Sequence, residues 1–210
     1  MPAKVNEREY RLILEGAIEA RDAGENRKIV EGYATTFDQE YTLYSFGEFE
    51  LRESIARNAF DETDMSDVIM QYDHEGRVFA RKSNGTLQLE TDDHGLKIRA
   101  DLGGTEIGRQ LYEEIKGGYT TKMSFGFTVN GEQRTEEEID GKTIIHRRIT
   151  AIKKLFDVSA VSLPANEATE ITSRNLGEGV IAQVKQEKLA RAAREKTKKQ
   201  IEIIAGGISK

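Results

Sequence analysis

The segment TTKMSFGFTV, Thr120–Val129, places a serine at a sparsely filled position of a predicted strand. Side chains alternate between the two faces of a strand, and Met123, Phe125, Phe127 and Val129 share the apolar face. Ser124 and Gly126 lie on the other face, where a solvated strand would carry longer charged side chains. A hydroxyl beside a missing side chain leaves room for a ligand or another chain, and it is a candidate nucleophile. An edge strand with a bulge gives the same pattern.

A carboxylate is predicted to lie across from this serine. Asp140-Gly141 is typical of a two-residue hairpin turn. A hairpin closed there without bulges places Asp157, in the segment LFDVSAVS, directly opposite Ser124 and on the same face. One bulge in these long arms would shift the register, and a slip of one residue would reverse the face. The run Glu136–Glu138 would alternatively lie in a longer loop.

A serine becomes a nucleophile when a base, usually histidine, takes its proton and a carboxylate orients that base. The chain has three histidines. His94 lies in a predicted hairpin turn, and His146 is predicted to pair far from Ser124. His74 ends a predicted strand, Asp67–Gly76, and is the candidate base. A partly exposed histidine at a strand end, without a chemical role, remains the alternative for this residue.

Short strands and helices account for the segments around these residues. Alternation predicts strands at Tyr10, Leu12 and Leu14, at Lys28–Asp38, and in a hairpin formed by Leu87–Leu89 and Leu96–Ala100. Ser54 is a predicted N-cap for a short helix, SIARNAFDET. Thr105 is a predicted N-cap for a second helix, which Gly117-Gly118 ends. An α+β fold is therefore expected.

Composition limits the classes of function. The chain has 210 residues, a net charge of −6 and no cysteine, so disulfides, thiolate nucleophiles and cysteine zinc sites are excluded. Three scattered histidines fit no standard metal pattern, and no cofactor is expected. No run of about 18 apolar residues and no secretory segment is recognised, so no membrane partner is expected.

The charge is divided unevenly along the chain. From Lys185 to Lys210 there are eight Lys or Arg and three Glu, whereas the rest of the chain is acidic. The sequence therefore predicts a body at residues 1–176 and a basic helical tail at residues 177–210, with Val180, Ile181, Val184, Leu189 and Ala192 on one stripe. This tail could bind nucleic acid, dock on a scaffold coil, or be a solvated helix.

Five segments in order resemble the prohead proteases of tailed phages: VEGYATTF, YDHEG, TLQLETDDHGLKIRADL, MSFGF and LFDVSAVSLPANEAT. The resemblance spans roughly Ile29 to Ala168. It implies a serine endopeptidase in which His74 and Ser124 are catalytic and Asp157 is the third member. The family pattern favours Glu at that last position, and the related herpesvirus assemblin uses a second histidine, so His146 is a rival to Asp157.

The resemblance also implies a fold and a task. The fold would be a bent antiparallel β-barrel, as in herpesvirus assemblin, with helices on its outside. The enzyme would act in the host cytoplasm inside the immature capsid, where it would cut scaffold or the scaffolding arm of the major capsid protein and then itself. Self-association is possible and nucleic acid is not an expected partner. Arg147 and Arg148 are candidates to support the oxyanion site. The alternative function is a non-catalytic assembly module with a protease-like barrel.

Overall fold

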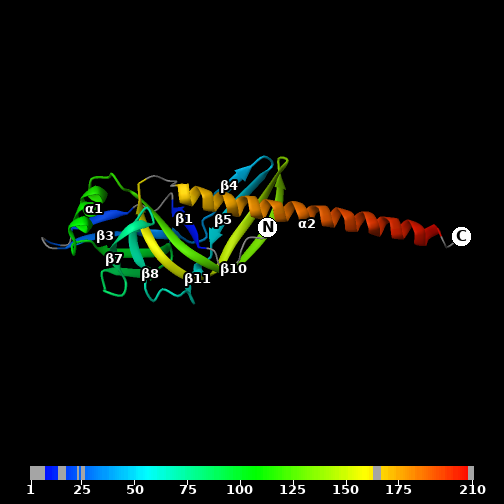
Figure 1. Ribbon diagram of the computed structural model, residues 1–210. Helices are drawn as coiled ribbons and strands as arrows, with labels where there is room; N and C mark the ends of the chain where they lie inside the picture. Colours follow the sequence, from blue (N-terminus) through cyan, green and yellow to red (C-terminus); the bar gives the residue numbers. More distant parts are fainter. Residues whose placement is uncertain (1–7, 14–17, 23, 25–26, 163–166, 208–210) are drawn as a thin grey trace.

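The computed structural model describes residues 8–13, 18–22, 24, 27–162 and 167–207, and over these residues it forms strands, two α-helices and one short 3-10 helix (Figure 1). The strands are β1 Glu9–Ile13, β2 Glu19–Asp22, β3 Lys28–Thr36, β4 Tyr41–Phe46, β5 Phe49–Ile55, β6 Ile69–Tyr72, β7 Glu75–Arg81, β8 Leu87–Thr91, β9 Gly95–Asp101, β10 Lys122–Ile139 and β11 Lys142–Val161. The helices are η1 Arg57–Phe60, α1 Glu106–Lys116 and α2 Glu167–Gly207.

The strands form two sheets, and buried side chains of both sheets belong to one core cluster. One sheet has the order β1-β10-β11-β5-β4, with β6 also on β11 and β7 on β6. The other has the order β2-β3-β9-β8. The α+β class is confirmed, but the expected antiparallel barrel is not. β11 pairs in parallel with both β5 and β6, and in the described residues the end strands β1 and β4 do not pair to close a barrel.

The long hairpin β10–β11 is the spine of the first sheet. Asp140 and Gly141 both have positive φ, 50° and 77°, which is the two-residue turn predicted from their types. The predicted register holds from this turn to Glu132, which faces Ile149. Irregularities between Gly126 and Glu132 then shift the pairing. Ser124 therefore faces Ser159 rather than Asp157, and because the net shift is two residues, the face is unchanged.

The apolar face of β10 supplies the centre of the core. Met123, Phe125 and Phe127 are completely buried, and they belong to one cluster with residues of the second sheet such as Leu96 and Ile98. Burial of side chains of this size is worth about 1.5–3 kcal/mol each. This packing fixes the rotation of β10, so that its other face presents Ser124 and Gly126.

Two local predictions were wrong at their boundaries, and one was confirmed. Ser54 is not a helix N-cap: it lies in β5, where it pairs with Arg148 of β11, and sheet pairing holds it extended. The helix that follows is only the short η1, with Ala56 as its N-cap. Thr105 does cap α1, since its hydroxyl accepts a hydrogen bond from the Gly108 amide.

The helix α2 begins earlier than the sequence predicted and projects beyond the sheets (Figure 1). Gly177 is inside this helix; a Cβ there would lie 2.2 Å from the Tyr44 ring, so the glycine permits close contact with β4. Val180, Ile181 and Val184 are buried in a cluster with Leu51 and Ile145, as the predicted stripe requires.

The apolar stripe of α2 does not continue along the helix. Leu189 is 72% exposed, and the part of α2 from Gln186 to Glu202 is almost entirely solvated. No helix in the described part of the chain is long and apolar enough to cross a membrane. Leu14, predicted in the first strand, lies outside the described residues.

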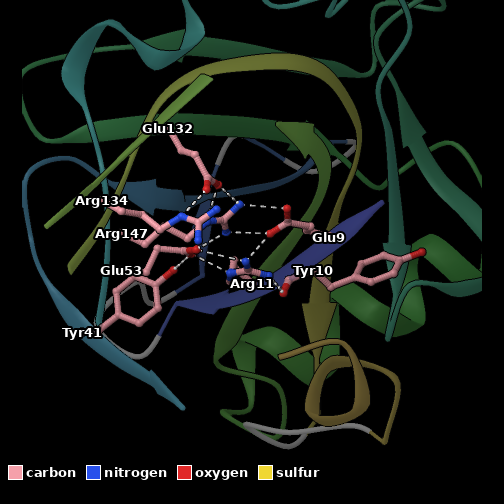
Figure 2. A network of polar contacts seen from close by, with 8 residues as sticks. All are labelled: Glu9, Tyr10, Arg11, Tyr41, Glu53, Glu132, Arg134 and Arg147. Atoms are coloured by element: carbon pink, nitrogen blue, oxygen red, sulfur yellow. Dashed lines mark hydrogen bonds and ion pairs between the residues drawn. The ribbon is translucent and has the colours of Figure 1, made fainter. Parts of the chain in front are cut away.

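A buried network of charges joins β1, β5 and the hairpin (Figure 2). The Arg11 guanidinium donates to both carboxylate oxygens of Glu53, at 2.6 and 3.0 Å, and Arg147 donates to Glu53, Glu9 and Glu132. Arg11, Glu53 and Arg147 are at most 3% exposed. Burial alone would raise the pKa of Glu53, but the two guanidinium groups lower it to about 2, so Glu53 stays ionised.

Replacing Arg147 by methionine should destabilise the fold strongly. The substitution leaves Arg11 as the remaining buried guanidinium for both Glu9 and the fully buried Glu53, and breaking such a network typically costs about 3–5 kcal/mol. The neighbouring Arg148 is a matched control, because its side chain is 44% exposed and pairs with Asp38 at the surface. Arg148→Met should cost about 1 kcal/mol or less. Equal losses of the free energy of unfolding in urea for the two variants would contradict this account.

Candidate active site

Three adjacent strands bring Ser124, His74 and Asp157 together. Ser124 is in β10 and pairs directly with Ser159 of β11. Asp157 lies two residues before Ser159 in the same strand. On the other side of β11, β6 runs parallel to Asp157–Ala160 and leads directly into the turn that carries His74. The strand order β10-β11-β6 therefore places the serine and the carboxylate on neighbouring strands and the turn that carries His74 close to both.

His74 lies in a tight hairpin turn and not at the end of one long strand, as the sequence predicted. β6 ends at Tyr72 and β7 begins at Glu75, so Asp73 and His74 form the two-residue turn, both with positive φ, 49° and 62°. This conformation costs free energy for residues other than glycine. The Asp73 carboxylate holds the turn by accepting hydrogen bonds from the amide and the hydroxyl of Ser162 at the end of β11.

The imidazole of His74 bridges the other two side chains. Nδ1 is 2.6 Å from Asp157 Oδ1, and Nε2 is 2.5 Å from Ser124 Oγ. The pKa of Asp157 is lowered from its usual value: burial opposes ionisation, but the hydrogen bond from His74, the Arg8 guanidinium and the hydrogen bond from Ser159 outweigh it. An ionised carboxylate only accepts hydrogen bonds, so Nδ1 carries the proton and Nε2 is free to accept the hydrogen of the Ser124 hydroxyl.

Gly126 explains the sparse face of the serine strand. It pairs directly with Asp157, and a Cβ at Gly126 would lie 2.3 Å from Asp157 Oδ2 and 2.8 Å from Arg8 Nε. The missing side chain is therefore the space in which the carboxylate and a guanidinium meet. The irregular pairing predicted as an alternative is also present, beginning between Gly126 and Phe127.

Sequence reasoning missed two partners of the carboxylate. Ser159 donates its hydroxyl to Asp157 Oδ1 at 2.8 Å, and strand alternation from Asp157 could have identified it. Arg8 pairs with Asp157 Oδ2, and its guanidinium lies 5.0 Å from the Tyr10 ring centre. No pattern in the sequence marks Arg8, because its partner is 149 residues away.

The other candidates lie elsewhere. His146 faces Thr135, as predicted, and its ring nitrogens contact Glu40 and Glu137, so it is not the partner of His74. His94 stands beside the Tyr33 ring in the β8–β9 turn region. Arg147 belongs to the buried network and Arg148 pairs with Asp38, so neither guanidinium is placed to support an oxyanion near Ser124.

A groove adjoins the His74 turn. It has a volume of about 580 Å³ and lies between the β6–β7 hairpin and α1. Phe79, Ile107 and Leu111 supply apolar surface, while Glu75 and Glu114 place carboxylates at the groove. Among the described residues, no cluster of three or more potential ligands could hold a metal ion.

Comparison with known proteins identifies one family. Residues 16–187 match the family model described as caudovirus prohead serine protease. No curated protein and no solved structure matches the chain significantly. The matched residues include Ser124, His74 and Asp157, whereas β1 ends before the first matched residue.

Gly126→Ala should disrupt the site and lower stability. The added methyl group meets the Asp157 carboxylate, and such overpacking typically costs about 1–3 kcal/mol. Gly104→Ala is the control, since no described atom lies within 4 Å of a Cβ there. Thermal unfolding should show a lower melting temperature for Gly126→Ala alone, and an unchanged melting temperature would contradict the close contact.

Proposed function

The chain belongs to the prohead serine protease family of tailed phages, and from this we propose that Ser124, His74 and Asp157 are the catalytic triad of an endopeptidase that matures the phage capsid. The observation that supports the roles most strongly is the continuous chain of hydrogen bonds from Asp157 through His74 to Ser124. Each of the three residues has the chemistry that its place in that chain requires.

The proposed reaction begins when Ser124 Oγ attacks the carbonyl carbon of the scissile peptide bond. His74 Nε2 takes the hydroxyl proton and then gives it to the nitrogen of the leaving amine as the bond breaks. Water, deprotonated by the same nitrogen, hydrolyses the acyl-enzyme and regenerates the serine. Asp157 remains ionised throughout, because its pKa is already lowered, and it stabilises the imidazolium that forms at each transfer.

The proposed substrates are scaffold or the scaffolding arm of the major capsid protein, and the enzyme itself. Family membership supports this, together with action inside the immature shell in the host. The groove beside the His74 turn is a suitable site for a substrate side chain: its apolar residues would contact an aliphatic or aromatic group. Glu75 and Glu114, partly offset by Arg77, would favour a basic group near it.

A second candidate is a non-catalytic assembly module with the same sheets. One observation favours it: Ser124 is only 1% exposed, so a peptide cannot reach its hydroxyl in this conformation. The two candidates differ in whether the purified chain cuts protein at all.

Ser124→Ala should abolish cleavage of the scaffold-bearing capsid protein. Loss of a triad serine typically lowers the rate by about 10⁴–10⁶-fold, since the remaining site has no nucleophile. Ser45→Ala is the matched control, because Ser45 is an exposed serine of β4. Electrophoresis of the products with time measures the rates. Cleavage by Ser124→Ala at the control rate would exclude the proposed triad.

We further propose that the body, residues 1–176, carries out proteolysis and that the basic tail, residues 177–210, brings the enzyme into the assembling shell. The support is the solvated, positively charged part of α2, which projects away from the site (Figure 1). The first turns of the tail, including Val180 and Val184, pack on the body and anchor it.

Ending the chain after Gln186 should reduce incorporation into the shell without reducing proteolysis. The truncation keeps Val180, Ile181 and Val184, so peptide cleavage should stay within about twofold of the full chain, a difference below 0.5 kcal/mol. Incorporation into shells assembled in cells, measured by quantitative immunoblotting of purified proheads, should fall severalfold. Equal incorporation of the truncated and full chains would remove the targeting role.

A further inference from the structure

The serine strand has no free edge where the triad lies. On one side, residues 122–126 of β10 pair with β11. On the other side, residues 123–127 pair with β1, which places Leu12 opposite Ser124 and Tyr10 opposite Gly126. A peptide substrate that added to this sheet as an extended strand would need the edge that β1 occupies.

The N-terminal segment also covers the triad on its open face. The Tyr10 ring centre is 4.4 Å from that of His74, and Arg8 pairs with Asp157 while lying 4.7 Å from the Phe156 ring centre. The His74 side chain is only 4% exposed. Nε of Arg8 is buried without a hydrogen-bond partner in the described part of the chain. A buried donor without an acceptor costs free energy, so it makes the packing of the N-terminal segment over the triad less stable.

The opposite face of β1 contributes to the buried charge network (Figure 2). The pairing within this network would let another strand replace β1. β1 contributes one acid and one base, Glu9 and Arg11, which pair with each other. If both left, Glu53 would keep Arg147 at 2.5 Å and the Tyr41 hydroxyl at 2.6 Å. The network thus divides into two parts, and removal of β1 leaves no buried carboxylate without a partner.

The family match does not include β1. The match begins at residue 16, after the end of β1 at Ile13, and contains the whole triad. β1 therefore lies outside the matched region, although it pairs with the edge of β10 that carries Ser124.

We propose that β1 is a latch that keeps the protease latent by filling the position of a substrate strand beside Ser124. The proposal rests on the proposed protease function. Cleavage requires β1 to leave the β10 edge, and the substrate that replaces it is an extended peptide segment pairing antiparallel with residues 123–127. Removal of Tyr10 and Arg8 with the strand would uncover His74 and Asp157 at the same time.

The rate at which a fluorophosphonate labels Ser124 tests this latch without any need for the natural substrate. Glu9→Gln/Arg11→Met removes the β1 part of the network and should label at least tenfold faster than the natural chain. Tenfold corresponds to only about 1.4 kcal/mol of docking free energy. Glu19→Gln/Arg21→Met is the matched control, an exposed pair with the same spacing in β2, and it should label at the natural rate.

A second variant tests the opposite direction. The natural chain has no cysteine, and Ile13 and Met123 are paired positions in the register of β1 and β10. In Ile13→Cys/Met123→Cys, oxidation should fix β1 in place and reduce labelling at least tenfold, and dithiothreitol should restore it. Each single-cysteine variant controls for the substitution itself.

The outcomes separate the latch from the protease function. Mass spectrometry of the peptides gives the labelled residue in each case. Labelling of Ser124 that is equally fast in the natural chain, the Glu9/Arg11 variant and the oxidised chain would overturn the latch and leave the protease intact. No labelling of Ser124 in any form, the Glu9/Arg11 variant included, would overturn the protease function and the latch with it.

Discussion

The structure of the site depends on one buried, ionised carboxylate. Asp157 is completely buried, and an unpaired charge in that position would be very costly. Its oxygens therefore require donors, which come from distant segments: the imidazole of His74, the hydroxyl of Ser159 and the guanidinium of Arg8. The same requirement demands empty space at Gly126. A single acid thus explains the tight turn at His74, the sparse face of β10 and the position of the N-terminal segment.

The strand β11 links this chemistry to the stability of the fold. Its first part pairs with β5 and carries Arg147 into one buried charge network, and its last part pairs with β6 and carries Asp157 into the other. β1 contacts both: Figure 2 shows Arg11 inside the first network and Tyr10 pointing away from it, and the Tyr10 ring packs against His74 of the second. Because one short strand touches both networks, any event that moves β1 changes the burial of charge and the accessibility of the serine together.

The sequence predicted which side chains meet at the site better than how the strands pair around them. Residue types, strand alternation and the family resemblance together selected Ser124, His74 and Asp157, and the structure brings these three side chains into contact, with the serine and the acid on one face. The register was wrong by two residues because bulges leave no reliable mark in a sequence. The turn at His74 was missed because Asp-His lacks the glycine usual in such turns. The buried network was also missed, since Arg11 and its partners resemble the solvated charges of any exposed strand until the far strands are placed over them.

We infer that Asp157 fixes the tautomer of His74 so that Nε2 faces the serine hydroxyl. Nitrogen-15 NMR of the imidazole groups tests this directly, with the His74 signals assigned by their loss in His74→Gln. At neutral pH the account predicts a protonated Nδ1 and an unprotonated Nε2 for His74, and a loss of this preference in Asp157→Asn. A His74 ring protonated at Nε2 alone would contradict the account, because that nitrogen could not accept the proton of Ser124.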